Sequence, residues 1–121
     1  MPHPDKGKDA ETLAGSYLER HGLSLLQRNY QSRHGEIDLV MTDGDCIVFV
    51  EVRYRRQSTF GSGVETVDHR KQARITACAR YYLQQHPTVS ARPCRFDVIG
   101  ISGSLKNPRF DWIADAFPAS A

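Results

Sequence analysis

The chain of 121 residues is long enough for one domain with a modest hydrophobic core. Its 40% hydrophobic and 25% charged residues are ordinary for a globular protein, and a net charge of +2 permits a nucleic-acid partner without requiring one. No apolar run approaches the length of a membrane span, and we expect no signal peptide at the start. The three cysteines form no Cys-x-x-Cys pair, so reduced, buried thiols and a cytoplasmic location are expected.

Helical periodicity predicts two helices. The first runs from about Lys8 to His21, with Gly22 as its C-terminal cap. The second runs from about Val64 to Gln85, and Thr66 or Asp68 could start it.

Strand patterns predict a sheet between and after these helices. The predicted strands cover residues 23–30, 35–41, 46–53 and 94–101, with a short edge strand at 110–113 after a turn at 102–104. Residues 1–6 and 118–121 are expected to be frayed tails. The order α-β-β-β-α-β-(β) predicts a single α/β domain (α+β, with a mixed sheet) over residues 1–121.

The segment from Gly35 to Arg53 is predicted to be a β-hairpin that turns at Asp43-Gly44. That turn pairs Thr42 with Asp45, which places Glu36 opposite Glu51 and Asp38 diagonal to it. By alternation, one face then carries Glu36, Asp38, Glu51 and Arg53. Opposed carboxylates destabilise a strand pair, so this face needs a cation, and a one-residue bulge would move half of the set to the other face.

Carboxylates on neighbouring strands are ligands that suit Mg²⁺, a hard ion that also binds water and phosphate oxygens. Asp38 and Glu51 are the candidate ligands, and Arg53 could stabilise developing negative charge. The alternative is a half-exposed hairpin with a solvated charged face. Glu11, in the first predicted helix, is most simply a solvated residue near the helix N-terminus.

Basic residues follow the acidic hairpin. They are Arg53, Arg55 and Arg56 at the strand end, and His69, Arg70, Lys71, Arg74 and Arg80 on the second helix. Such residues could bind the phosphates that flank a cleaved bond, although an ordinary solvated helix face explains several of them equally well. Lys71 is different, because it falls on the apolar stripe of its helix between Val67 and Ile75.

Two motifs, Gly35-Glu36-Ile37-Asp38-Leu39-Val40 and Val48-Phe49-Val50-Glu51-Val52-Arg53-Tyr54-Arg55, resemble the YraN family. Further segments that resemble this family are Ala10-Glu11-Thr12-Leu13-Ala14, Val67 with Lys71, and Cys94-Arg95-Phe96-Asp97-Val98. YraN proteins are a poorly characterised bacterial group with the restriction-endonuclease-like, PD-(D/E)xK, fold. The layout is also similar to archaeal Holliday-junction resolvases.

The resemblance implies a nuclease-type core. Glu11 would be the acidic residue delivered by the first helix, Asp38 and Glu51 the metal ligands, and Arg53 the residue at the catalytic-lysine position. Glu36 belongs to the YraN-like pattern but not to the general nuclease motif, so it is a further candidate ligand. Because arginine keeps its proton, Arg53 cannot act as a general base, and Lys71 is hypothesised to supply the missing amine.

The expected function is Mg²⁺- or Mn²⁺-assisted phosphodiester hydrolysis by an endonuclease-like protein that acts on DNA, including branched or structured DNA. Arg55, Arg56, His69, Arg70 and Arg74 are the expected nucleic-acid-binding residues. Two alternatives stay open: a non-catalytic nucleic-acid-binding module on the same fold, and a protein-interaction adaptor. Restriction-type cores often dimerise to cut two strands, which leaves a homodimer open as well.

Overall fold

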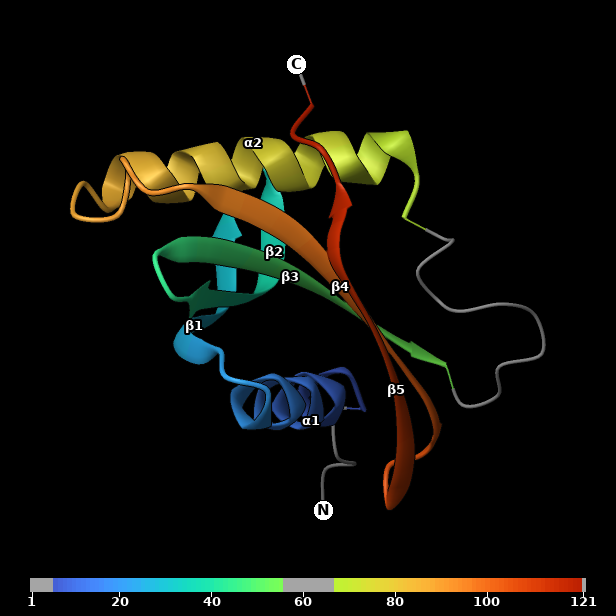
Figure 1. Cartoon of the computed structure of the whole chain (residues 1–121). Coiled ribbons are helices and arrows are strands. Elements are labelled where there is room, and N and C mark those ends of the chain that lie inside the picture. Colours follow the sequence, from blue (N-terminus) through green and yellow to red (C-terminus); the bar gives the residue numbers. More distant parts are fainter. Residues whose placement is uncertain (1–5, 56–66, 121) are drawn as a thin grey trace, which may run out of the picture.

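A five-stranded mixed sheet lies between two helices in the computed structural model, which describes residues 6–55 and 67–120 (Figure 1). The elements are α1 (Lys6–Arg20), β1 (Ser24–Ser32), β2 (Gly35–Asp43), β3 (Cys46–Arg55), α2 (His69–Gln85), β4 (Cys94–Ser104) and β5 (Asn107–Phe117). The strands lie in chain order in the sheet, and only β3 and β4 are parallel, because α2 carries the chain back between them. The predicted mixed α/β class and element order are confirmed.

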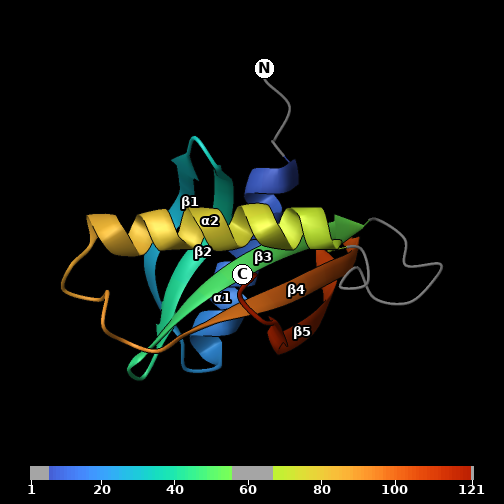
Figure 2. The same cartoon turned by 90° about the horizontal axis from the view of Figure 1, so that it is seen from above.

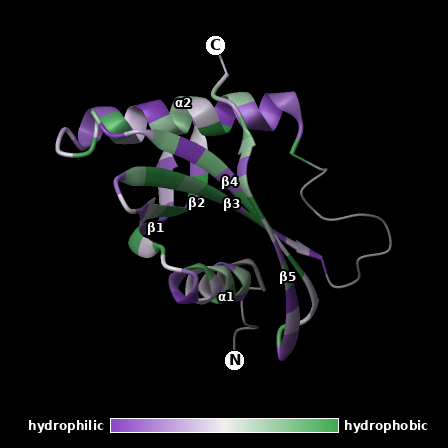
Figure 3. Cartoon of the chain, in the orientation of Figure 1, coloured by the Kyte–Doolittle hydropathy of each residue, from purple (hydrophilic) through white to green (hydrophobic). Residues whose placement is uncertain are grey.

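Each helix covers one face of the sheet, as the two views in Figures 1 and 2 show. Alternation along the central strands sends Val40, Phe49 and Val98 to the core under α2. Their neighbours Leu39 and Val50 face the core against α1, so strand β3 is apolar on both faces. Figure 3 shows this as hydrophobic residues along the central strands and hydrophilic ones recurring along α2.

Local signals set the helix ends. The backbone N–H groups of Gly22 and Leu23 donate to the carbonyls of Glu19 and Leu18, so Gly22, with φ +99°, closes α1 as predicted. Asp68 is the N-cap of α2, because its side chain accepts a hydrogen bond from the N–H of Lys71. The expected earlier start of this helix, at Val64 or Thr66, lies outside the described residues.

The β4–β5 hairpin is longer than predicted. Its turn lies at residues 105–106 rather than 102–104, and β5 is a full edge strand rather than a short one. The carboxylate of Asp97 is fully buried here and accepts hydrogen bonds from Arg95, the indole N–H of Trp112 and the backbone N–H of Asp115. These bonds fix the register shift between β4 and β5, which no alternation pattern predicts.

The chain end is tied to α2 as far as Ser120. Its N–H donates to Thr76, and its carbonyl accepts from Arg80. Residues 118–120 are therefore held in place rather than frayed as expected, whereas residues 1–5 lie outside the described part.

The cysteines differ in exposure. Cys78 is buried as expected, but Cys46 is half-buried and Cys94 is exposed, so the expectation of three buried thiols is wrong for those two. All three are free. Neither α1 nor α2 is long and apolar enough to cross a membrane.

Candidate functional site

Strands β2 and β3 pair in a register two positions away from the predicted one. The pairs run from Asp43–Cys46 to Leu39–Val50, so the tight turn is Gly44-Asp45, with Gly44 at φ +59°. The predicted hairpin is confirmed, but the predicted pairing of Thr42 with Asp45 is wrong. The observed register brings Asp38, rather than Glu36, level with Glu51.

The ladder between the two strands ends at this level. Beyond the Leu39–Val50 pair, the Oδ2 atom of Asp38 accepts a hydrogen bond of 2.7 Å from the backbone N–H of Val52. The Asp38 side chain thus accepts the Val52 N–H in place of a backbone carbonyl of β2. The carboxylate of Asp38 is fixed at the point where the strands separate.

Alternation along β2 is interrupted at Asp38. Ile37 and Val40 both face the core under α2, whereas Leu39 between them faces the other core. The adjacent strand β1 is irregular at the same level, because Asn29 has φ +51° between the pairs Arg28–Leu39 and Tyr30–Ile37. This irregularity has the effect of a β-bulge. The side chains of β2 before Asp38 therefore point to the opposite face from the one that regular alternation predicts.

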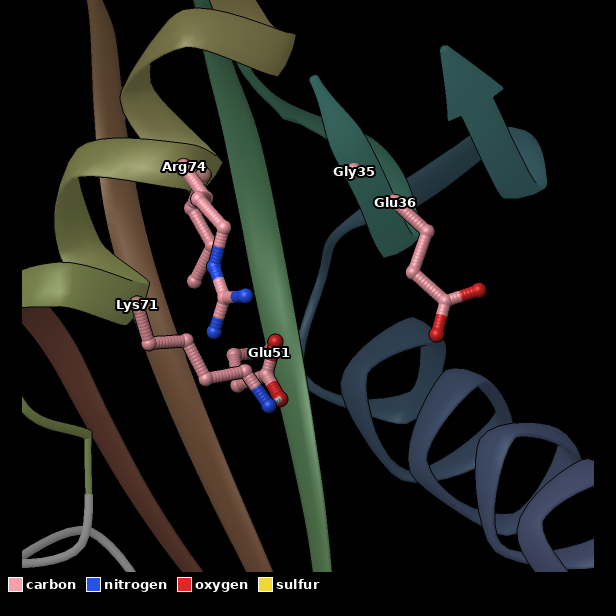
Figure 4. Close-up of a pocket in the computed structure, with 6 residues that line it drawn as sticks. Gly35, Glu36, Glu51, Lys71 and Arg74 are labelled. Carbon is pink, nitrogen blue, oxygen red and sulfur yellow. Dashed lines mark ion pairs between the residues drawn. The ribbon is translucent and has the colours of Figure 1, made fainter. Parts of the chain in front are cut away.

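Glu36 is therefore turned away from Glu51, although its charge still reaches Asp38. Figure 4 shows its side chain directed away from Glu51 and toward α1. The prediction that Glu36 lies opposite Glu51 is wrong because of the observed register. The prediction that both share one face is wrong because of the irregularity at Asp38.

Two cations converge on one oxygen of Glu51. The Nζ atom of Lys71 lies 2.7 Å from Oε1 of Glu51, and NH1 of Arg53 lies 3.7 Å from the same atom. Glu51 is only 7% exposed, so these contacts offset the cost of burying its charge. The structure thus brings the inward Lys71 of α2 to the Glu-x-Arg segment of β3.

A pocket of about 250 Å³ opens beside this group. It is lined by Gly35, Glu36, Glu51, Lys71, Arg74 and Ile75. In Figure 4 the side chains of Lys71 and Arg74 reach from α2 toward Glu51. A separate pocket lies along the end of β3 at residues 52–55.

Asp38 is the carboxylate whose proton affinity the site changes most clearly, through burial first and neighbouring negative charge second. Burial, followed by the charge of Glu51, raises the pKa of Asp38 to about 7, and the charges of Glu11 and Glu36 add to the rise. The Val52 N–H works in the opposite direction by stabilising the carboxylate. Glu11 of α1, which has one buried carboxylate oxygen, therefore lies within electrostatic reach of the strand carboxylates.

A divalent cation would offset this negative charge, and the donor chemistry suits Mg²⁺ or Mn²⁺. Asp38 and Glu51 offer hard oxygen atoms from adjacent strands. Within residues 6–55 and 67–120, however, no three His, Cys, Asp or Glu side chains are grouped closely enough to form a metal site by themselves. Magnesium commonly binds one or two carboxylates and completes its shell with water and substrate oxygens, so the residues fit such an ion.

Residues 10–101 match the model of the uncharacterised protein family UPF0102. A UPF0102 protein of Nitrosococcus oceani is 49% identical over 115 residues, which cover 95% of this chain and 93% of that protein. A UPF0102 protein of Ectopseudomonas mendocina is 49% identical over 117 residues, covering 97% of this chain and 98% of that protein.

The chain belongs to the UPF0102 family. UPF0102 is the YraN family, so the resemblance found in the sequence motifs is confirmed.

The predicted basic residues of this UPF0102 chain fall into separate groups. Arg53 contacts Glu51, and Arg55 is exposed at the end of β3. His69, Arg70 and Arg74 are exposed on the first half of α2. Arg80 is directed elsewhere, because its guanidinium binds the carbonyl of Ser120, and Arg56 lies outside the described residues.

Two contacts of the UPF0102 site had no signal in the sequence. The Val52 N–H that holds Asp38 is a backbone group, which residue identity does not reveal. Arg28 of β1 donates a hydrogen bond of 2.6 Å to Thr12, the residue after Glu11, and so ties α1 to β1 beside the site. Only a three-dimensional arrangement brings these residues together.

Proposed function

We propose that this UPF0102 chain is a metal-dependent, endonuclease-like phosphodiesterase that acts on DNA. The observation that carries the proposal is the meeting of Asp38, Glu51 and Lys71 where strands β2 and β3 separate. Two carboxylates with an ammonium group 2.7 Å from one of them combine metal ligands with a phosphate-directed cation. The fold and the family motifs agree with this assignment.

Asp38 and Glu51 would hold Mg²⁺ or Mn²⁺, with Glu11 close enough to assist. A bound ion of this kind neutralises phosphate charge and lowers the pKa of a bound water. The Val52 N–H fixes one oxygen of Asp38 and leaves the other available. Asp38 is therefore already held in place, whereas Glu51 would have to share its Oε1 atom between the ion and Lys71.

The two cations would take different roles. Arg53 keeps its proton and presents a planar fork, which suits the stabilisation of negative charge on a phosphate. Lys71 carries a compact ammonium group that can orient an attacking water beside Glu51. In this proposal Lys71 supplies the amine that the Glu-x-Arg segment lacks.

Exposed basic residues would hold the phosphates on either side of the cleaved bond. Arg55, His69, Arg70 and Arg74 lie on the two elements that border the site, and Arg56 follows directly in the sequence. Binding through such contacts weakens steeply as the salt concentration rises. DNA binding should therefore be measured at low and physiological salt.

One observation favours a second function, a nucleic-acid-binding module without turnover. The Lys71–Glu51 ion pair engages a carboxylate oxygen that a metal ion would otherwise use. The binding module predicts salt-dependent DNA binding that survives a chelator and involves no cleavage. The Arg53→Lys variant distinguishes the nuclease from the binding module. A gain of cleavage indicates a decayed nuclease, and a loss of cleavage indicates an enzyme adapted to arginine.

The test of the proposed function is a cleavage assay with Mg²⁺ or Mn²⁺ on linear, nicked and branched DNA. Asp38→Asn and Glu51→Gln should abolish cleavage, whereas Asp111→Asn, a matched change at an exposed position of β5, should not. Calorimetric titration of Mn²⁺ supplies a readout independent of activity, and the same two variants should lose the binding heat. Cleavage that persists in Asp38→Asn and Glu51→Gln would overturn the assignment.

A further inference from the structure

Positive charge is concentrated on the α2 side of the sheet. Helix α2 contains Arg70, Lys71, Arg74 and Arg80 and no Asp or Glu, in a chain whose net charge is only +2. The neighbouring β1–β2 turn carries Arg33 and no acidic residue, whereas Arg28 of β1 faces α1, where it donates to Thr12. A polyanion would therefore find its most favourable surface along α2 and the β1–β2 turn.

Arg74 is the basic residue that joins this surface to the pocket. Within the described residues, no hydrogen bond or ion pair engages its guanidinium, and Figure 4 shows the side chain directed toward Glu51. Gly35 lies beside it: a Cβ atom at that position would come within 3.9 Å of the Arg74 Cβ atom. A guanidinium without a partner at the pocket wall is suited to bind a phosphate next to the reacting one.

A pair of rings lies further along the same side of α2. Tyr81 follows Arg74 by seven positions, which is two helical turns or roughly 10 Å. Its ring contacts that of His34 in the β1–β2 turn, with centroids 6.1 Å apart and an interplanar angle of 60°. Both side chains are half-exposed.

The β1–β2 turn contacts α2 between Arg74 and Tyr81. The Sγ atom of Cys78 lies 3.5 Å from the carbonyl oxygen of Gly35, and the hydroxyl of Ser32 donates to Cys78. Arg74, Gly35 and the His34–Tyr81 rings therefore form one continuous strip that leads away from the pocket.

A second ring pair on α2, Tyr82 with His86, is a structural contact and serves for comparison. Tyr82 and His86 stack with centroids 3.9 Å apart, and Tyr82 is buried in the core. The Tyr82 ring also contacts the rings of Tyr30 and Phe49 and is only 3% exposed, so it has no surface left for another molecule. The looser, half-exposed rings of His34 and Tyr81 retain surface for another flat molecule.

We propose that this strip binds an unpaired nucleic-acid strand that continues from the pocket, with Arg74 on a phosphate and the His34–Tyr81 rings against a base. The proposal rests on the proposed function and specifies its substrate class. Aromatic rings stack on bases whose faces are accessible, and a base inside a duplex has both faces covered. The substrate is therefore a nucleic acid with a single-stranded segment beside the cleavage point.

Fluorescence anisotropy in a buffer with EDTA tests the strip without cleavage. The probes are a labelled single strand, a blunt duplex, and the same duplex with a single-stranded overhang. The single strand and the overhang should bind more tightly than the blunt duplex. Tyr81→Leu should weaken their binding about tenfold, and Tyr81→Phe, which keeps the ring, should not.

Charge is tested separately from the ring. Arg74→Gln should weaken binding of all three probes and lower the salt dependence, because a phosphate contact is lost. Arg109→Gln, at an exposed position of the edge strand β5, is the matched control and should bind as the unmodified protein does, because this strand lies at the other edge of the sheet from β1. Thermal unfolding of each variant establishes that Tyr81→Leu still folds.

Photo-crosslinking adds a readout that a structural role for the rings would not produce. A single strand carrying 5-iododeoxyuridine should crosslink to His34 or Tyr81, as mapped by mass spectrometry of the peptides. Equal affinity for the blunt duplex and the single strand, together with unchanged binding by Tyr81→Leu, would overturn the strip while leaving metal-dependent cleavage intact. Tight binding of the single strand without cleavage in the presence of Mg²⁺ or Mn²⁺ would instead support the binding strip and overturn the proposed nuclease activity.

Discussion

The Nζ atom of Lys71 on α2 lies 2.7 Å from Oε1 of Glu51 on β3, joining the crossover helix to the centre of the sheet. Glu51 is 7% exposed and Lys71 33% exposed, so this ion pair is only partly screened by water. It therefore contributes to folding as well as to the chemistry of the site.

Removing Lys71 should destabilise the metal-free protein. Lys71→Met leaves Glu51 with Arg53 at 3.7 Å as its remaining ion-pair partner among the described residues. The expected cost is about 1–3 kcal/mol, because a buried carboxylate loses a short charged hydrogen bond. Urea unfolding of Lys71→Met, Glu51→Gln and the double variant measures the coupling, and Arg70→Met is the exposed control on the same turn. Additive effects of the two changes would contradict the pair.

The N-cap of α2 should matter for both stability and the position of Lys71. The Oδ1 atom of Asp68 accepts a hydrogen bond of 2.8 Å from the backbone N–H of Lys71. Asp68→Ala should cost about 1 kcal/mol, and Asp68→Ser should recover most of it, since serine also caps helices. Thermal unfolding measures the loss, and equal stability of the two variants would show that the cap contributes nothing.

The sequence was sufficient for the fold class and for bringing Asp38 and Glu51 together, but not for the position of Glu36. Side-chain facing has a period of two along a strand, so a register error of two positions left Asp38 and Glu51 adjacent. The Asp-Gly signal correctly located the hairpin, but it did not decide which two of three consecutive polar residues form the loop.

Other features depend on contacts that no local pattern encodes. The irregularity at Asp38 is matched by Asn29 on the neighbouring strand, and it turned Glu36 to the other side. Helical periodicity placed Lys71 on the inner stripe of α2. Its partner, Glu51, could not be predicted, because it depends on how the helix packs across the sheet. The network joins Asp97 to residues up to 18 positions away and had no signal in the sequence.

The Asp97 network should be among the most sensitive points of the fold. Asp97 is 0% exposed and accepts hydrogen bonds from Arg95, Trp112 and the backbone of Asp115. Asp97→Ala should cost about 2–4 kcal/mol, because the N–H groups of Trp112 and Asp115 lose their acceptor and the half-buried Arg95 keeps only Asp43 as an ion-pair partner among the described residues. Fluorescence of the single tryptophan during urea unfolding reports the change directly. Asp111→Asn on exposed β5 should shift the unfolding midpoint little, and a similar small shift for Asp97→Ala would refute this role.

The raised pKa of Asp38 should make the stability of the metal-free protein depend on pH. Burial and Glu51 raise this pKa to about 7, whereas an unfolded chain releases the proton near pH 4. Between these values the folded state binds more protons than the unfolded state, so stability falls as the pH rises and levels off above about pH 7. Asp38→Asn removes this dependence and should therefore gain stability relative to the unmodified protein between pH 5 and pH 8.

Urea unfolding in EDTA at pH 5 and pH 8 measures that difference, with Asp45→Asn in the exposed β2–β3 turn as the control. Adding Mg²⁺ at pH 8 should stabilise the unmodified protein, because an ion that binds only the folded state shifts the equilibrium by mass action. The Asn variant should not respond to the ion. If the profiles of the unmodified protein and Asp38→Asn run parallel from pH 5 to pH 8, then Asp38 does not hold a proton in the folded state, and the effect of burial and neighbouring charge inferred at this site is absent.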